Sequence, residues 1–185
     1  MRFIYLLLFT LLLVACESSV EMSELMYQNG TYMLKSSEKP YSGLVTGVES
    51  GEMINGVKQG VWVEYNASGA KVEEGTYTDG YKTGPWKIFH ENGEIWKQGS
   101  YDAKGLRTGE WSTFDKDGKM LIKGNFQQDI QEGIWEYYHL SGSVRAKGNM
   151  SGGKRNGEWV RLDEEGNQLE SKLWNMGVDT TTETE

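Results

Sequence analysis

The stretch that decides the fold is "GPWKIFHENGEIWKQGSY", residues Gly84 to Tyr101. It holds a Gly-x-Trp, an aromatic residue three positions after the tryptophan, a turn that ends in glycine, and a Gly-x-Tyr. The same pattern returns as "GEWSTFDKDGKMLIKGNF" from Gly109 and as "GIWEYYHLSGSVRAKGNM" from Gly133. Such a fixed period indicates a repeat architecture, in which each copy packs on its neighbours.

Two columns of residues define the repeat. The tryptophans of the first column are Trp62, Trp86, Trp111, Trp135 and Trp159, spaced by 24, 25, 24 and 24 residues. The glycines of the second column are Gly75, Gly99, Gly124 and Gly148, each two residues before an aromatic residue or methionine. In the last copy Lys172 replaces this glycine, while Trp174 keeps the aromatic position.

Each copy predicts a β-hairpin. The segments "NASG", "HENG", "DKDG", "HLSG" and "DEEG" end in glycine, which suits a turn whose last residue has positive φ. Flanking segments such as "WVEY" and "LIKGNF" are rich in β-branched and aromatic residues, as strands are. A glycine inside a strand leaves a gap, and we predict that a neighbouring tryptophan covers each one.

The repeat unit resembles the MORN-type repeat in its bacterial variant. Its pattern is G-x-W-x-x-[YF]-x-x-x-G, followed about six residues later by G-x-Y. The resemblance covers roughly residues 25–178 and implies an all-β fold: an extended, twisted, single-layer antiparallel sheet of consecutive β-hairpins. Proteins of this variant are often described as the antitoxin half of a toxin–antitoxin pair.

The N-terminal residues predict export and lipidation. A 12-residue apolar run, Phe3 to Val14, follows Arg2 and is too short for a transmembrane helix, which needs about 20 residues. It ends in "LVAC", which resembles the bacterial lipobox and implies acylation of Cys16, the only cysteine. The alternative is an ordinary secretory signal that contains a cysteine. We therefore predict a signal peptide at 1–15, a lipidated N-terminus and tether at 16–24, a repeat domain at 25–178 and a disordered tail at 179–185.

The composition argues against several classes of function. The net charge is −8 and the sequence pI about 4.9, so the surface repels nucleic acid. The two histidines, His90 and His139, stand two repeats apart, about 19 Å on a regular sheet, too far for one zinc ion. No Gly-x-Ser-x-Gly elbow occurs, and an open sheet offers no obvious cleft for paired carboxylates. We expect no enzymatic activity, no cofactor and no metal site.

One column of charged residues is a candidate binding strip. Four residues before each tryptophan of the column stand Lys58, Lys82, Arg107, Gln131 and Arg155. Four cations in an acidic chain predict a row along one edge of the sheet, for an anionic partner. The alternative is that these side chains balance acidic neighbours and keep exposed turns soluble.

The aromatic residues leave a similar choice. The tryptophan column holds the sheet together, or part of it forms an apolar patch on an open face, the usual mark of an interface. Trp96 lies outside the column and is the candidate for an exposed anchor.

These observations predict a lipoprotein of the bacterial cell envelope, held to a membrane through lipid on Cys16. Glu17 after the cysteine favours the outer membrane, facing the periplasm. The expected function is a non-catalytic protein-binding or scaffolding module whose partner is an envelope protein. The alternative is an antitoxin or immunity protein that neutralises a toxic partner at the envelope.

Overall fold

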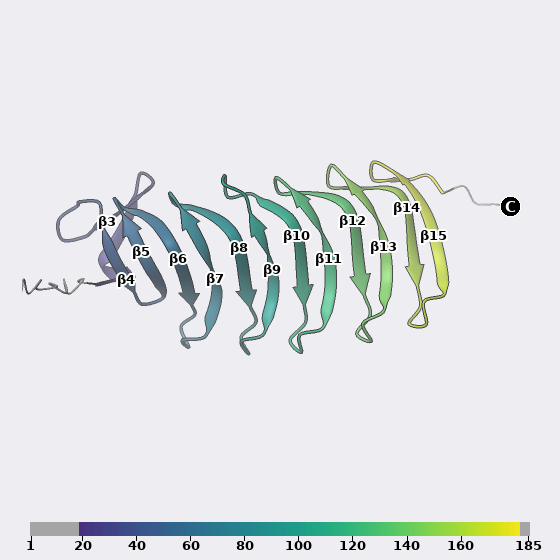
Figure 1. Ribbon diagram of the computed structural model, residues 1–185, viewed down its shortest axis with the longest axis horizontal. Coiled ribbons are helices and arrows are strands. Elements are labelled where there is room, and N and C mark those ends of the chain that lie inside the picture. The colour runs from purple at the N-terminus through teal and green to yellow at the C-terminus, as the bar shows by residue number, and fades with distance from the viewer. Residues whose placement is uncertain (1–18, 182–185) are drawn as a thin grey trace, which may run out of the picture.

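The computed structural model describes residues 19–181 of the chain, which form one long sheet beside a small hairpin. The predicted signal peptide, Cys16 and residues 182–185 lie outside the described residues. Fourteen strands follow one another across the main sheet in the order β1-β4-β5-β6-β7-β8-β9-β10-β11-β12-β13-β14-β15-β16, and β2 pairs with β3 alone. Figure 1 shows this sheet as a twisted row, with β3 and β4 near one end and β15 at the other.

The N-terminal segments are short. They comprise β1 (Val20–Glu21), the 3-10 helix η1 (Met22–Glu24), β2 (Leu25–Gln28), β3 (Thr31–Leu34), β4 (Gly43–Thr46) and β5 (Glu49–Ile54). The repeat strands are β6 (Val57–Tyr65), β7 (Lys71–Thr78), β8 (Tyr81–Phe89), β9 (Ile95–Tyr101), β10 (Arg107–Phe114), β11 (Met120–Gln127), β12 (Ile130–Tyr138), β13 (Val144–Ser151), β14 (Lys154–Leu162), β15 (Gln168–Asn175) and β16 (Val178–Asp179). Within residues 19–181 no helix is long and apolar enough to cross a membrane.

The predicted fold of consecutive hairpins is confirmed, with differences at both ends. β1 runs parallel to β4, which makes the sheet mixed rather than wholly antiparallel. Residues 20–24, expected to belong to a tether, form this strand and η1 because Val20 and Met22 pack against the N-terminal core. At the other end Asp179 pairs with Trp174, so the tail is ordered at its start.

Two kinds of turn join the strands. The predicted glycine-ended turns are present, and Gly93 closes one of them with φ of 87°. At the opposite ends of the strands most connections are two-residue turns with two positive φ values, as at Asp79 (50°) and Gly80 (81°). Such turns match the right-handed twist of the strands. The one interval of 25 residues arises because a longer loop, closed by the Gly105 N–H to Asp102 carbonyl bond of 3.1 Å, replaces this turn.

Each tryptophan of the column covers a glycine of the preceding strand, as predicted. Gly75 lies opposite Trp86 in the register of β7 and β8, and a Cβ atom on Gly75 would overlap the indole. The same overlap occurs for Gly99 with Trp111, Gly124 with Trp135, Gly148 with Trp159, and Gly51 with Trp62. The indole N–H of Trp111 also donates to the Ser100 carbonyl at 3.1 Å. Each hairpin thus packs against the one before it through a tryptophan–glycine contact.

The covering rings form a continuous line that we call the aromatic ladder. Its members from β6 to β12 are Trp62, Tyr77, Trp86, Tyr101, Trp111, Phe126 and Trp135. Neighbouring centroids lie 5.3 to 6.2 Å apart with interplanar angles of 80° to 88°. Each edge-to-face pair contributes about 0.5–1.5 kcal/mol beyond the area it buries. The ladder therefore stabilises a sheet that has no second layer over most of its length.

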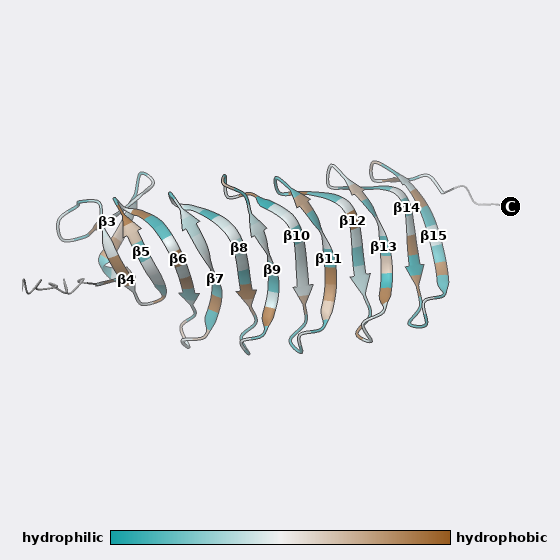
Figure 2. Cartoon of the chain, in the orientation of Figure 1, coloured by the Kyte–Doolittle hydropathy of each residue, from teal (hydrophilic) through white to brown (hydrophobic). Residues whose placement is uncertain are grey.

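The two ends of the ladder are finished differently. At the N-terminal end the β2–β3 hairpin packs against a core of buried side chains, Leu25, Tyr41, Val45, Met53 and Trp62. At the C-terminal end Trp135, Met150 and Trp159 form a second cluster against which Trp174 packs. Figure 2 shows apolar and polar segments interspersed along the strands, as expected where a narrow ladder rather than a whole face is buried.

Candidate functional site

The face of the sheet that carries the aromatic ladder, here called the tryptophan face, also carries the predicted cationic column. Its members lie inside strands and reach over the rings rather than lining an exposed loop edge. Lys58 Nζ lies 4.5 Å from the Trp62 ring centroid, and Lys82 Nζ 4.2 Å from that of Trp86. Arg107 Cζ lies 4.0 Å from the Phe126 ring, and Arg155 Cζ 4.6 Å from that of Trp159. The reason is register, because the connections before β6, β8, β10 and β14 end before these positions and leave them in the strands.

Three of these cations have an acidic partner. Lys58 pairs with Glu49, Lys82 with Glu73 at 2.6 Å, and Arg107 with Asp129 at 2.6 Å. The hydrogen bond from Arg107 holds the pKa of the Asp129 carboxyl below its ordinary value. For these three positions the geometry favours the alternative stated above, that the cations balance acidic neighbours.

Arg155 is the exception in this column. Its guanidinium group lies over both Trp159 and Trp174, and that group has no ion pair or hydrogen bond within residues 19–181. The fifth position, Gln131, belongs to the copy in which Met150 replaces the aromatic residue. A cation thus stands in each copy whose second column ends in an aromatic residue, Tyr77, Tyr101, Phe126 or Trp174.

A row of carboxylates crosses the N-terminal part of the tryptophan face. Glu64 is directly opposite Glu49 on one side and Glu73 on the other in the strand register. Burial raises the pKa of the Glu64 carboxyl above its ordinary value, and the charges of Glu73 and Glu49 raise it further. Lys58 and Lys82 oppose this shift in pKa without cancelling it. Like charges opposite each other destabilise a sheet, so this row costs stability.

Replacing Glu64 by glutamine is expected to raise the thermal midpoint at pH 7. A carboxyl whose pKa is higher in the folded state binds more protons when folded, so stability falls as pH rises through the folded pKa. The gain from Glu64→Gln should therefore be present at pH 7 and absent near about pH 3, where the carboxyl is protonated in both states. Glu91→Gln, the same charge change in an exposed turn, is the control. Equal gains at both pH values would contradict the assignment.

The C-terminal part of the tryptophan face is hollowed. A depression of about 500 Å³ is lined by Trp159 and Trp174 and by four cations, Arg145, Arg155, Arg161 and Lys172. Glu170 is its carboxylate, and it pairs with Arg161 at 3.0 Å and with Lys172 at 3.5 Å. We call this depression the cationic hollow. The arrangement can bind an anion and an apolar group together.

The sequence did not single out Arg145, Arg161 or the carboxylate row. Arg145 is the extra residue of a bulge, since Tyr137 pairs with Ala146 and Tyr138 with Val144. A bulge redirects its side chain, which strict alternation along the strand does not anticipate. The regular repeat of the turns was the sequence signal for this bulge, because the same register shift occurs between Ile88 and Phe89 in another hairpin.

Trp96 lies outside the aromatic ladder, in agreement with the sequence. It is 40% exposed, with Lys97 Nζ 4.0 Å from its ring and the His90 ring at 6.0 Å. It is not among the residues lining the cationic hollow. Its role as an anchor for a partner stays a prediction.

The two histidines connect neighbouring hairpins. His90 Nε2 lies 3.0 Å from the Phe114 carbonyl oxygen, and His139 Nε2 lies 3.0 Å from that of Leu162. In other copies the equivalent Asn66 or Asp115 accepts backbone hydrogen bonds of its own turn instead. In the described part of the chain no three His, Cys, Asp or Glu side chains are grouped to hold a metal ion.

A comparison with protein-family models supports the repeat architecture. A family model described as a MORN repeat variant matches residues 82–103, 107–128 and 131–151. No curated protein sequence matches the chain. Among solved structures, the crystal structure of TarM is similar at 11% identity and a TM-score of 0.29, over 57% of this chain and 21% of that one. The tryptophan–glycine register continues on both sides of the matched segments, at Trp62 and Trp159. The chain is thus a repeat protein whose central three repeats match the MORN repeat variant.

Proposed function

We propose that this chain is a non-catalytic protein-binding module held to a bacterial envelope membrane by lipid on Cys16. The observation that carries the proposal is the exposure of large apolar side chains on a sheet that its own ladder already stabilises. Val61 is 69% exposed, Tyr81 57% and Ile134 55%. Isolated exposed apolar side chains are common, but Val61 and Ile134 occupy the same position in two repeats, so one partner can contact both copies.

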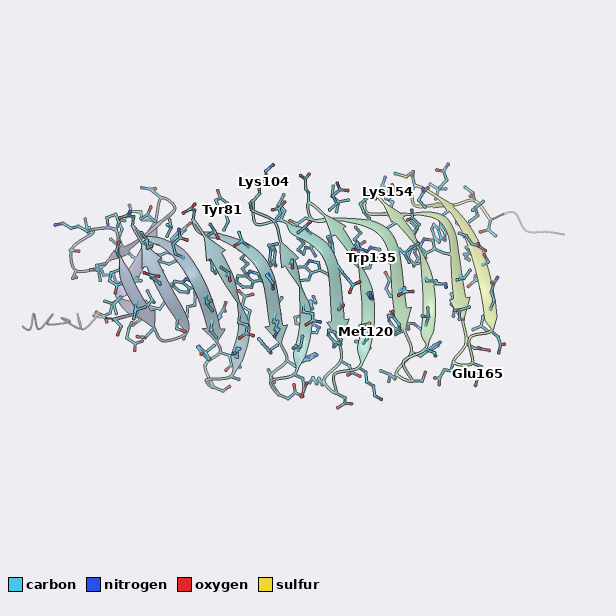
Figure 3. All side chains as sticks on the ribbon, in the orientation of Figure 1. Tyr81, Lys104, Met120, Trp135, Lys154 and Glu165 are labelled. Carbon is cyan, nitrogen blue, oxygen red and sulfur yellow. The ribbon has the colours of Figure 1, made fainter. Side chains whose placement is uncertain are left out.

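The positions of these side chains fit an extended partner. Val61 and Ile134 both fill the middle position of Gly-x-Trp, so their side chains point away from the tryptophan face. Tyr81 begins β8 at the turn edge of the sheet, where Figure 3 also places Lys104 and Lys154. Hairpins advance a sheet by about 9.6 Å each, so a partner that meets these positions spans several repeats.

The lipid anchor is supported by the sequence "LVAC" before Glu17 and by the absence of other cysteines. Several acyl chains, each contributing about 0.8 kcal/mol per buried CH₂, hold a protein to a bilayer. We place the module at the outer membrane, facing the periplasm.

A pull-down of the tagged, lipidated protein from its native envelope in mild detergent tests this function. Two variants accompany it: Cys16→Ser, which removes the lipid, and Val61→Ser with Ile134→Ser, which removes exposed apolar surface without touching the ladder. We expect an envelope protein to be recovered at fixed stoichiometry, less of it with the surface variant, and none with Cys16→Ser.

Other outcomes would change the proposal. A secreted partner whose toxicity co-expression relieves would make this protein an immunity protein, the alternative that the repeat family suggests. Recovery that is unaffected by both variants would contradict the module as described. Failure to recover any protein under conditions that retain known envelope complexes would also contradict it.

A further inference from the structure

We propose that the cationic hollow binds a short acidic peptide segment of the partner, with a carboxylate on Arg155 and Arg145 and an apolar side chain on the tryptophan rings. The proposal rests on the proposed function, since it names the chemistry of the partner of the same module. It concerns the C-terminal end of the tryptophan face, formed by β13, β14 and β15.

Two arginines of the cationic hollow have no acidic partner in the part of the chain that the structure describes. Lys58, Lys82 and Arg107 are each paired with a carboxylate. Arg155 and Arg145 line one hollow, and their guanidinium groups have no ion pair or hydrogen bond within residues 19–181. Both side chains are exposed, so the two guanidinium groups are available to pair with the carboxylate of a ligand. Guanidinium groups suit carboxylates because they can donate two parallel hydrogen bonds.

The rings of Trp159 and Trp174 lie beneath Arg155 in the hollow. Arg155 Cζ lies 4.6 Å from the Trp159 centroid and 4.9 Å from that of Trp174, so the guanidinium group is held over the rings. Cation–π contacts of this kind preorganise the guanidinium and reduce the entropy lost on binding. The rings also offer apolar surface inside the same hollow. The ligand therefore carries an apolar group beside its anion, as a peptide does and inorganic phosphate does not.

The distribution of charge on the tryptophan face limits the size of the ligand. The N-terminal part of the tryptophan face carries the Glu49, Glu64 and Glu73 row. A nucleic acid strand or an anionic membrane surface would extend along the face and meet these carboxylates. A short acidic segment contacts only the hollow, whose volume of about 500 Å³ holds a few side chains. The charge distribution thus favours a peptide over a polyanion.

The test is a calorimetric titration of the full chain in mild detergent with an acetylated, amidated hexapeptide of alternating leucine and glutamate. The counterpart with glutamine in place of glutamate is the control probe. We expect saturable binding of the glutamate peptide only, weakened at least tenfold by Arg155→Gln and by Arg145→Gln. Affinity should fall as salt rises from 50 to 200 mM, because the contact is electrostatic and partly exposed.

Matched variants separate the hollow from general charge effects. Lys154→Gln makes the same charge change one residue from Arg155, outside the hollow lining, and should leave affinity unchanged. Circular dichroism melting curves check that each variant is folded. If Arg155→Gln does not fold, Arg155→Lys, which keeps the positive charge, replaces it. The double variant Glu183→Gln, Glu185→Gln is titrated as well. These two glutamates follow β16 in the sequence and carry the same carboxylate group as the glutamates of the probe.

The outcomes are decisive in both directions. No saturable binding to either the full chain or the Glu183→Gln, Glu185→Gln variant would overturn the proposal, as would equal loss with Lys154→Gln. Arginine-dependent binding of phosphatidylglycerol vesicles or inorganic phosphate without the peptide would replace it with a headgroup or phosphate site. A partner recovered equally well by pull-down with Arg155→Gln would leave the module standing and refute the hollow.

Discussion

Replacing Gly99 by valine is expected to lower the free energy of unfolding by about 3 kcal/mol, because the new side chain takes the space of the Trp111 indole. A Cβ atom at Gly99 would overlap three atoms of that ring, and the ring is 7% exposed. The indole cannot move aside and keep its contact with Tyr101, whose centroid lies 5.3 Å away. Urea unfolding followed by far-ultraviolet circular dichroism measures the loss.

Ser100→Val is the matched control for this prediction. It introduces the same side chain on the next residue of β9, where alternation directs it to the other face of the sheet. Valine is favoured in strands, so little or no loss of stability is expected from Ser100→Val. Similar losses for the two variants would show that the strand, and not the glycine niche, is sensitive, and would contradict the tryptophan–glycine register.

Replacing Trp111 by alanine is expected to cost about 3–5 kcal/mol, the range for removal of a buried large aromatic side chain. Its ring contacts Tyr101 at 5.3 Å and Phe126 at 6.2 Å, so the substitution interrupts the ladder near its middle. Repeat proteins gain stability chiefly from interfaces between neighbouring repeats. We therefore expect unfolding to become biphasic as well as less stable, with the two parts of the sheet melting separately.

Hydrogen exchange resolves this second effect. In Trp111→Ala, amides of β9 and β10 should lose protection first, while those near the N-terminal core around Met53 stay protected. Trp96→Ala is the control, because Trp96 is 40% exposed and lies outside the ladder. A single cooperative transition, or an equal loss in the free energy of unfolding for Trp96→Ala, would contradict the role of the ladder in connecting the repeats.

Sequence reasoning predicted the repeat, its turns and the covered glycines because these depend on residues close in the chain or at a constant offset. Gly75 and Trp86 are 11 residues apart, the span of one turn and its two half-strands, so their pairing follows once hairpins are assumed. The ends were harder. Val20 joins the sheet beside Val45, a parallel contact that no local pattern specifies.

The charges on the tryptophan face were the least predictable from the sequence. Lys82 was identified, but whether it faced a partner or Glu73 depended on which residues the strand register places opposite each other. A shift of one residue in register moves every side chain to the other face. Glu64 became notable only because Glu49 and Glu73 flank it in space.

By itself, then, the sequence determined an all-β repeat protein of consecutive hairpins in which tryptophans pack over glycines. It could do so because turn geometry and steric fit are local properties. Only the tertiary structure decided where the charges meet. Arg145, Arg155 and Trp174 come from three strands, and a bulge in β13 brings the first of them to the hollow. Cross-strand neighbours and bulges arise from the pairing of whole strands, which no single repeat encodes.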